Sequence, residues 1–480
     1  MEGKARAIAI DAGGEVMVVD DVFMSNEPAR FENEDWHRLL VHIKNLGASD
    51  LHVKSGEQGR VRVQGRVAPV TRRRLELAEV GHLARLLYQG DNAELEIKGG
   101  KPLDGAYALR LNRDSGLRFR YNASACDTRG GTGIKITLRE LPEEPPPLDV
   151  AELGQDVVDA FVLNSEGVGF VCGATGSGKT TLLAGLNRYI LEMKDSDSVI
   201  ETLEHPIEFT FDRVHKSASS LITQRAVPEH VPSFSDGVRN VLRCDPDYIM
   251  VGEARDSATI EAVLLAATTG HMVFTTLHSY SVGVTFRRIA SQVSQGQDAA
   301  AVIGGIIDAC RVIVCQSLYP DTSGRRVAVR EVLVFNEEIR TRLIKTAARS
   351  LTELPVVAQE LVKQFGQTKL VHAKRLLAEG RLAQRYVDLI DLEQSRLQSS
   401  GEGNEEIDPT SILARAVTQL RAAPSSHALS QVAESLVAKF GEQLVADANH
   451  AANAGRIDPL YAEVLQQAEY TLMERKHGQD

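Results

Sequence analysis

Hydrophobic and polar residues follow two different periods in the first third of the chain. The spacing of Trp36, Leu39 and Ile43 predicts a helix that ends at Gly47, and a second helix is expected over residues 79–88. Apolar and polar positions alternate over residues 51–70, 107–111, 117–121 and 133–138, which is typical of strands. Residues 33–140 therefore predict a small α+β domain with an antiparallel sheet. Residues 1–32 predict either an extra strand pair or a loose arm.

A proline-rich segment predicts the first domain boundary. Four prolines lie between Leu141 and Leu148, so this segment can form neither a helix nor an inner strand. We expect a stiff linker over residues 141–150. Beyond it, helical segments alternate with short apolar runs at residues 168–172, 198–203, 248–251 and 271–277. This order predicts an α/β domain with a mainly parallel sheet over residues 151–345.

The remainder of the chain is expected to be helical and contains an internal repeat. Residues 357–366 recur as residues 432–441, with the same apolar positions and the same final Phe-Gly. At the same offset, Tyr386 corresponds to Tyr461. The repeat predicts a helical domain over 346–395, a flexible linker over 396–411 and a second helical hairpin over 412–480. The second copy is interpreted as added helical scaffold or as a docking module for a partner.

Composition narrows the class of protein. The chain has 480 residues, 43% of them hydrophobic and 25% charged, which is typical of a globular protein with about three domains. The formal net charge of −11 argues against dedicated binding of duplex nucleic acid. Five cysteines without a CxxC pair indicate reduced thiols of a cytosolic protein.

Membrane association is expected to be peripheral. The N-terminal residues lack the apolar segment of a secretory signal. The most apolar stretch, residues 299–315, contains Asp308 and Arg311, so it predicts a buried helix and strand rather than a membrane span.

One segment fits the phosphate-binding loop GxxxxGK[ST], between an apolar run and an amphipathic helix. The candidate nucleotide-binding residues are Gly173, Thr175, Gly176, Ser177, Gly178, Lys179, Thr180 and Thr181. Backbone amides of such a loop surround a polyphosphate, and the helix N-terminus adds positive potential. Lys179 is expected to reach the β- and γ-phosphates, and the Thr180 hydroxyl to bind Mg²⁺.

Acidic residues downstream supply candidates for the chemistry. Glu253 follows the apolar run 248–251, where a carboxylate can order water on Mg²⁺ or hold the attacking water. Pro206 predicts the end of a strand, so Glu204 and Glu208 are expected on a loop at the sheet edge. Glu208 is favoured as the base that activates water, with Glu204 in support. The alternative is an exposed acidic loop without a catalytic role.

Histidines and arginines are further candidates. His271 and His278 flank the apolar run 271–277, and the spacing of Cys and His suits no zinc site. His278 could contact a γ-phosphate or be structural. Arg225, Arg239 and Arg243 are either solvated surface residues or include a finger that contacts a neighbouring subunit's nucleotide.

Four motifs, in this order, resemble the secretion and pilus-motor ATPases of the PilT type. They are GATGSGKTT at 173–181, LEHPIEF at 203–209, RCDPDYIMVGEARD at 243–256 and TGHMVFTTLHS at 269–279. Residues 47–56 and 117–124 resemble the PAS-like N-terminal domain of that family. Residues 129–142 and 327–339 are most similar to DotB-like type IVB secretion ATPases and their conjugative relatives. The resemblance covers about residues 33–395.

The resemblance implies an α/β protein with a RecA-like P-loop core and a C-terminal helical extension. It implies a homohexameric ring that hydrolyses ATP with Mg²⁺. It places ATP in a cleft between two domains, where arginines such as Arg139, Arg118 and Arg120, or those of a neighbour, complete the site. It also implies a cytoplasmic location, peripheral at the inner membrane, and an inner-membrane secretion or pilus platform complex as partner. No direct contact with nucleic acid is expected.

Two departures from the pilus-motor pattern bear on the function: the first leaves open a scaffold that binds ATP without turnover, and the second weakens the interpretation as a pilus-retraction motor. His205 stands where pilus motors usually have an aspartate, and residues 338–345 match the motor signature AIRNLIRE only loosely. The favoured function is a motor for type IVB-like secretion or conjugative DNA transfer. The alternatives are a pilus-retraction motor, a RecA-like nucleic-acid translocase and a scaffold that binds ATP without turnover.

Overall fold

The chain divides into two compact units, Met1–His372 and Ala373–Asp480. The computed structural model describes residues 7–10, 16–18, 22–63, 65–112, 116–293, 298–322, 325–399, 416, 417, 420, 426–440, 444, 445, 448, 461 and 464–468. Most of the linker predicted over residues 396–411 lies outside the described residues.

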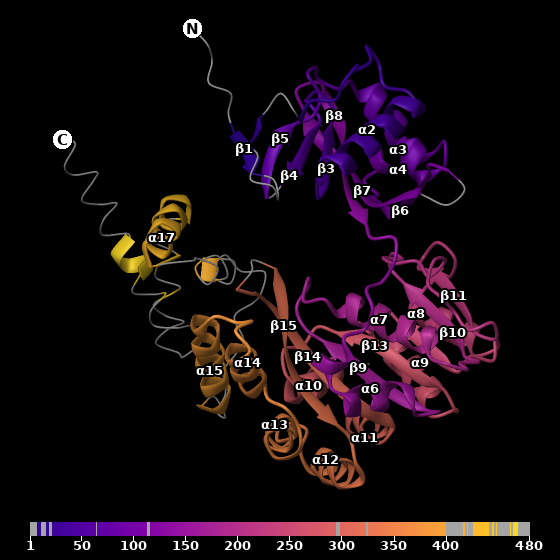
Figure 1. The fold of residues 1–480 in the computed structure, drawn as a ribbon, viewed down its shortest axis with the longest axis vertical. Coiled ribbons are helices and arrows are strands. Elements are labelled where there is room, and N and C mark those ends of the chain that lie inside the picture. Colours follow the sequence, from indigo (N-terminus) through magenta and orange to yellow (C-terminus); the bar gives the residue numbers. More distant parts are fainter. Residues whose placement is uncertain are drawn as a thin grey trace. The chain divides into compact units, whose positions relative to one another are not determined.

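The N-terminal part of the first unit contains an antiparallel sheet of six strands in the order β5-β4-β3-β8-β7-β6 (Figure 1). The strands are β3 (Asp50–Lys54), β4 (Arg60–Val63), β5 (Arg66–Pro69), β6 (Leu103–Arg110), β7 (Gly116–Thr128) and β8 (Gly131–Leu141). In β4, Val61 and Val63 are buried and Arg60 and Arg62 are partly exposed. This alternation gives the sheet one apolar face, as the sequence pattern predicted.

Three helices pack on the apolar face of this sheet. They are α2 (Asn33–Asn45), α3 (Leu77–Tyr88) and α4 (Ala93–Lys98). Val22, Met24 and Phe31 are buried in the same core, so the packed domain begins before residue 33. Further upstream, β1 (Ala7–Ile10) and β2 (Val16–Val18) form an antiparallel strand pair.

A seven-stranded sheet forms the centre of the following domain, in the order β11-β10-β12-β13-β9-β14-β15. The strands are β9 (Gly167–Cys172), β10 (Val199–Glu204), β11 (Leu221–Ala226), β12 (Tyr248–Val251), β13 (Met272–Leu277), β14 (Cys310–Pro320) and β15 (Arg326–Val334). Every neighbouring pair is parallel except β14 and β15. The prediction of an α/β fold with a mainly parallel sheet is therefore confirmed.

Helices cover both faces of this sheet. Successive residues of an inner strand point to opposite faces, so each is buried by a different set of helices. They are α5 (Val150–Leu153), α6 (Gln155–Val162), α7 (Lys179–Glu192), α8 (Phe234–Val241), α9 (Ser257–Ala267), α10 (Val282–Gln292), α11 (Ala299–Ala309), α12 (Glu337–Arg349) and α13 (Leu354–Phe365). Ile249 and Val251 pack with α8–α13, whereas Met250 packs with α6 and α7. This arrangement explains why the inner strands read as continuous apolar runs. Helix α11 followed by β14 also confirms the buried helix and strand predicted for residues 299–315.

Two features of this domain differ from the predicted pattern. The boundary expected after residue 345 falls inside α12, and Leu354, Leu361 and Val362 of α13 are buried in the core of the α/β domain. Helical spacing indicates that one face is apolar but does not reveal which core it joins. Strand β11 was not predicted, because only half of its residues are apolar and they do not alternate with the polar ones.

The C-terminal residues confirm the repeat at the level of burial. Helices α14 (Lys369–Ala378) and α15 (Gln384–Ser399) follow α13, and α17 (Ser426–Phe440) begins the second copy. Buried residues of the first copy correspond, 75 positions later, to buried residues of the second: Ala358 to Ala433, Leu361 to Leu436, Val362 to Val437, Ala373 to Ala448 and Ile390 to Leu465. The second copy has its own hydrophobic cluster, which includes Ala416, Val417 and Leu420.

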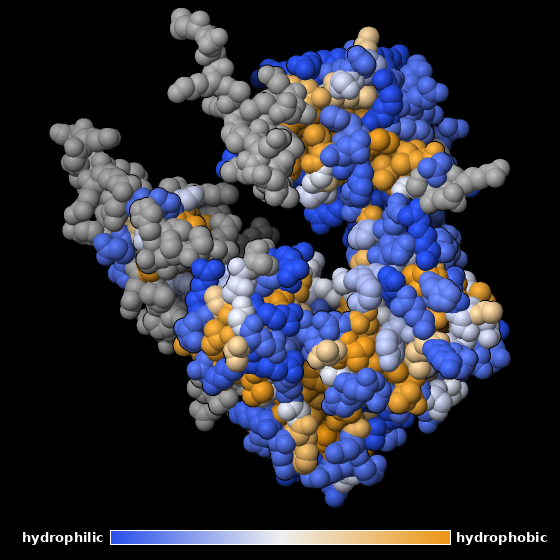
Figure 2. Space-filling view, in the orientation of Figure 1, coloured by the Kyte–Doolittle hydropathy of each residue, from blue (hydrophilic) through white to orange (hydrophobic). Residues whose placement is uncertain are grey.

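The surface is mixed in character. Figure 2 shows hydrophilic residues over much of the visible face, interrupted by hydrophobic patches. Among the described residues, no helix combines the length and the hydropathy needed to cross a membrane.

Candidate functional site

The motifs singled out in the sequence meet at one edge of the seven-stranded sheet. Strands β9, β10, β12 and β13 are parallel, and their last residues are Cys172, Glu204, Val251 and Leu277. The phosphate-loop pattern, the segment 205–208, Glu253 and His278 follow these strands directly. Ligands of open α/β sheets bind at the carboxyl ends of the strands. This edge is therefore the candidate functional site.

The loop after β9 has the backbone that its glycines predict. Gly176 and Gly178 have φ values of 78° and 84°, in the left-handed region where glycine is favoured. A Cβ atom on Gly178 would lie 2.9 Å from Nε2 of Gln316. Thr175 and Gly176 are exposed at the tip of the loop, and Ser177 is buried beneath it. Helix α7 begins directly after Gly178, so its free N–H groups and positive dipole end face the loop.

Lys179 lies within the loop that precedes it. Its Nζ donates to the carbonyl oxygens of Gly173 and Ala174 at 2.9 and 3.0 Å. Burial lowers the pKa of Lys179, whereas Cys172, Glu253 and Glu208 oppose this shift. The charges of both candidate carboxylates thus favour the protonated form of Lys179. Thr180 is partly buried in the first turn of α7, and Thr181 is exposed beside it.

Gln316, on β14, supports the loop from below and was missed in the sequence. Its Nε2 donates to the carbonyl oxygen of Ser177 at 2.6 Å, and its Oε1 accepts from Arg330 at 3.1 Å. Arg330, on β15, also donates to Glu152 of α5 at 2.7 Å. None of the three residues belongs to a nucleotide-binding motif, and the pairing of β9, β14 and β15 brings Gln316 and Arg330 behind the loop.

The position predicted for Glu204 is wrong. It is the last residue of β10 rather than part of a loop, and it is 4% exposed. Its Oε1 accepts from Thr202 at 2.7 Å and from Gln224 of β11 at 2.9 Å. The error has a physical reason, because β10 pairs with β11 on one side and β12 on the other, which encloses its end. Burial raises the pKa of Glu204 to about 7, despite these hydrogen bonds.

Glu208 lies beyond the strand, in the position predicted for it. It is partly exposed, four residues after Glu204. Arg118 of β7 donates to the carbonyl oxygens of Ile207 and Glu208, at 2.8 and 3.4 Å. The Glu208 carboxylate is thus on a segment that an arginine holds through its backbone.

Glu253 and His278 face each other across the ends of β12 and β13. His278 Nε2 lies 3.4 Å from Oε1 of Glu253, and both side chains are partly exposed. The backbone of Gly252 is fixed from both sides, by Leu203 of β10 and by the hydroxyl of Thr276. Burial lowers the pKa of His278, and the charge of Lys179 lowers it further, whereas Glu253 opposes the shift. The neutral imidazole is therefore favoured.

The structure does not bring His271 to this edge. His271 precedes β13 at the opposite end of the strand, where its Nδ1 contacts the Ala266 carbonyl at 3.3 Å. The rise of about 3.3 Å per strand residue puts it about 23 Å from His278. His271 is therefore not part of this site.

The candidate arginines are dispersed. Arg225 pairs with Glu201, a buried residue in the middle of the neighbouring strand β10. Arg239 lies 3.6 Å from Asp236 on the exposed side of α8, and Arg243 is exposed just beyond that helix. Arg139 donates to Asp50 within the N-terminal sheet at 2.8 Å. The finger hypothesis for these arginines remains a prediction.

The residues around the loop fit a magnesium ion bound together with a nucleotide. Thr180 offers a hydroxyl and Glu253 a carboxylate, the hard oxygen ligands that Mg²⁺ prefers. In the described part of the chain, no group of three or more His, Cys, Asp and Glu residues could hold a metal by itself. Mg²⁺ is commonly bound through one or two protein oxygens together with substrate phosphates and water.

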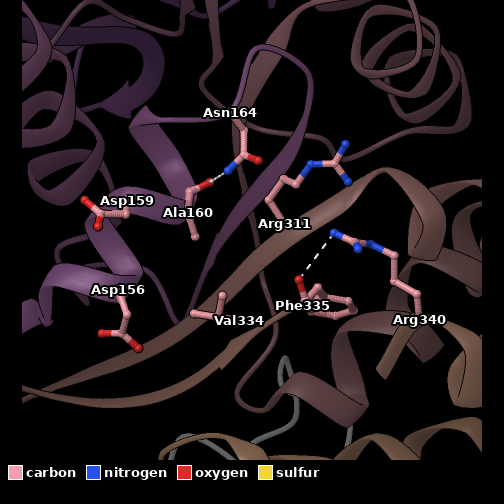
Figure 3. Close-up of a pocket in the computed structure, with 8 residues that line it drawn as sticks. All are labelled: Asp156, Asp159, Ala160, Asn164, Arg311, Val334, Phe335 and Arg340. Atoms are coloured by element: carbon pink, nitrogen blue, oxygen red, sulfur yellow. Dashed lines mark hydrogen bonds between the residues drawn. The ribbon is translucent and has the colours of Figure 1, made fainter. Parts of the chain in front are cut away.

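A separate hollow lies at the opposite ends of the parallel strands, away from the candidate site. Figure 3 shows Asp156 and Asp159 of α6 on one side and Arg311 and Arg340 on the other. Arg311 donates to the carbonyl oxygen of Glu166, and Arg340 to those of Cys310 and Phe335. These arginines therefore join the segment before β9, the start of β14 and α12 through the backbone.

Comparisons with known proteins agree on one family. Residues 29–383 match the family model described as Type II/IV secretion system protein. The chain is 32% identical to the uncharacterized protein YggR of Escherichia coli (strain K12) over 72% of its length and 98% of YggR. It is 34% identical to the type IV pilus retraction ATPase PilT of Pseudomonas aeruginosa, over 64% of this chain and 84% of PilT.

A solved structure agrees with these sequence matches. The X-ray structure of the Legionella pneumophila ATPase DotB superposes with a TM-score of 0.71 at 40% sequence identity, covering 77% of this chain and 99% of DotB. The family model spans most of the chain, so membership of this family accounts for both the motifs and the fold. The chain belongs to the type II/IV secretion system protein family, among its PilT-type and DotB-like secretion ATPases.

Proposed function

We propose that this protein is a Mg²⁺-dependent ATP hydrolase and that its site is the carboxyl edge of the seven-stranded sheet. One observation carries the proposal: the phosphate-binding loop with Lys179, the segment with Glu208, and Glu253 all follow the carboxyl ends of neighbouring parallel strands. A loop that binds phosphates needs carboxylates beside it to organise the ion and the attacking water. The family of secretion and pilus ATPases supports the same chemistry.

The residues divide the work of hydrolysis among them. Lys179 and the amides of residues 173–180 bind the phosphates, and Thr180 and Glu253 hold the metal and its water. Mg²⁺, when bound, neutralises charge on the phosphate oxygens. Glu208 takes a proton from the attacking water. The oxygen of that water bonds to the γ-phosphorus, and the bond from this phosphorus to ADP breaks. His278, beside Glu253, senses the presence of the γ-phosphate.

Turnover measurements test this assignment. Glu208→Gln should lower kcat by about 10²-fold or more, because it removes the base and leaves the phosphate loop intact. Lys179→Ala should lose nucleotide binding. Glu229→Gln, a change at an exposed glutamate, is the matched control and should hydrolyse ATP normally. Near-normal turnover by Glu208→Gln would refute its role as the base.

For the cellular process, we propose a ring-shaped homohexameric motor of a type IVB-like secretion or conjugative transfer system. It would act in the cytoplasm, at the inner-membrane complex of that system. The likeness to DotB over 77% of the chain favours this process. The likeness to PilT supports a second candidate, a pilus-retraction motor with the same chemistry.

Partner capture separates the two processes. Glu253→Gln protein, which should bind ATP without turnover, would be recovered from native membranes with ATP present. Lys179→Ala is the control, since it should not hold nucleotide. Enrichment of secretion or coupling-complex subunits supports the transfer motor, and enrichment of a pilus platform protein supports the retraction motor instead.

A further inference from the structure

The segment that follows His278 is held by residues outside the nucleotide-binding motifs. Ser279 Oγ lies 2.7 Å from the Thr285 hydroxyl, and the carbonyl oxygen of Tyr280 accepts from Lys369 at 2.8 Å. The backbone N–H of Val282 donates to Oε1 of Glu331 at 2.7 Å. These contacts fix the chain within four residues of the histidine, so they also limit where its imidazole can lie.

Glu331 is the unusual member of this set, because it is a buried carboxylate that links two helices. It lies on β15 and is 4% exposed. Its Oε1 faces the first residue of α10, and its Oε2 accepts from Gln359 of α13 at 2.9 Å. Burying a charged group costs free energy unless its partners compensate, so this position is expensive to maintain.

Capping of α10 alone does not account for Glu331. The side chain of Ser281 already caps this helix, accepting from the N–H of Val284 at 3.3 Å. Helices α10 and α13 also touch closely, since a Cβ on Gly283 would overlap the carbonyl oxygen of Pro355. Glu331 therefore adds a polar bridge where the start of α10 is already capped and packed.

We propose that Glu331 is a positioning residue for His278, acting through the N-terminus of α10, and that Gln359 of α13 holds Glu331 in its working orientation. This inference rests on the proposed ATPase function. Because the contacts run from Val282 through Glu331 to Gln359, the position of His278 beside Glu253 depends on α13. Displacement of a catalytic constellation by about 1 Å can cost about 10²-fold in rate, so a bridge four residues away is close enough to matter.

The test swaps the carboxylate of Glu331 and the amide of Gln359 between the two positions. Glu331→Gln keeps an oxygen for the Val282 N–H but presents an NH2 group to Gln359, so Gln359 loses its acceptor and must turn over to offer its own oxygen instead. We expect kcat to fall about 10-fold to 100-fold while the dissociation constant for ATP stays within about twofold. Adding Gln359→Glu restores a donor–acceptor pair and should return kcat to within about threefold of wild type.

The matched control uses another glutamine of α13. Gln364 is exposed and contacts Arg342, so Gln364→Glu adds the same charge to the same helix away from Glu331. It should not rescue Glu331→Gln. Rescue by Gln364→Glu, or no rescue by Gln359→Glu, would overturn the proposal, as would unchanged kcat in Glu331→Gln.

Two further readouts separate positioning from general loss of structure. Amide hydrogen exchange over residues 278–284 should accelerate in Glu331→Gln, with the melting temperature nearly unchanged. If Glu331→Gln does not fold, Gln359→Ala provides the milder change and should lower kcat without altering ATP affinity. Absence of turnover in the wild-type protein would refute the proposed function, whereas normal wild-type turnover with an unaffected Glu331→Gln would refute this inference alone.

Discussion

At the residue scale, Glu204 shows how burial changes the chemistry of a side chain. Three groups donate to its carboxylate, the Thr202 hydroxyl, the Gln224 amide and the backbone N–H of Glu208, and all favour the charged form. Burial nevertheless outweighs them and raises the pKa from the ordinary 4.5 to about 7. Near neutral pH, Glu204 is therefore partly protonated and can exchange a proton beside Glu208.

This shift predicts how stability depends on pH. The folded pKa lies above the unfolded value, so the contribution of Glu204 is fully present below pH 4.5 and is lost as the pH rises through 7. Glu204→Gln cannot lose a proton. The free energy of unfolding of Glu204→Gln minus that of the wild type should therefore increase by about 3 kcal/mol between pH 5 and pH 9.

Chemical denaturation at several pH values measures this difference. Glu229→Gln, at an exposed position, provides the baseline for a Glu-to-Gln change. A constant difference between Glu204→Gln and wild type over this pH range would contradict the raised pKa.

At the element scale, the phosphate loop depends on the two strands beside it. Gln316 of β14 donates to the Ser177 carbonyl, Arg330 of β15 orients Gln316, and Glu152 of α5 pairs with Arg330. Gln316 is 3% exposed, so its hydrogen bonds are shielded from water. The loop therefore rests on a polar chain that reaches α5, the first helix after the proline-rich linker.

Removing the middle of this chain should weaken nucleotide binding. Gln316→Met keeps the side-chain volume but leaves the Ser177 carbonyl without its donor. We expect the KM for ATP to rise about 10-fold and the free energy of unfolding to fall by about 1–3 kcal/mol. Steady-state kinetics and denaturation measure both, with Gln364→Met as an exposed control. An unchanged KM would show that the loop does not need Gln316.

At the scale of the whole molecule, the helices after the α/β domain divide into two groups. Leu354, Ala358, Leu361 and Val362 of α13 are at most 1% exposed in the core of the α/β domain. The second copy of the repeat packs around its own cluster. The sequence repeat therefore does not coincide with the boundary of the domain that contains the site.

Two truncations test this division. A chain that ends at Ser399 should retain ATP turnover within about twofold of the full chain, because both cores of the α/β domain remain complete. A chain that ends at Arg349 lacks α13, and losing four buried apolar residues should cost about 5–10 kcal/mol, comparable with total stability. Thermal denaturation and turnover measure both. Stable folding of the shorter chain would contradict the assignment of α13 to this core.

Much of the fold and part of the site were accessible from sequence, because local patterns encode them. The proline-rich segment, the apolar runs and the loop at Gly173 depend on neighbouring residues only. The motifs also indicated Lys179, Glu253 and His278, which the structure brings to one edge of the sheet. Their common position follows from the parallel order of the strands, which the alternation of strands and helices already predicted.

The tertiary structure decided what depends on residues far apart in the chain. Glu204 is buried because β11, a strand without an alternating pattern, pairs beside β10. Gln316 and Glu331 bear on the site only because β14 and β15 lie next to β9. His271 and His278 flank one strand, yet the parallel sheet puts only His278 at the nucleotide edge. Strand pairing sets these neighbours, and the periodicity of a single segment does not specify its partner in the sheet.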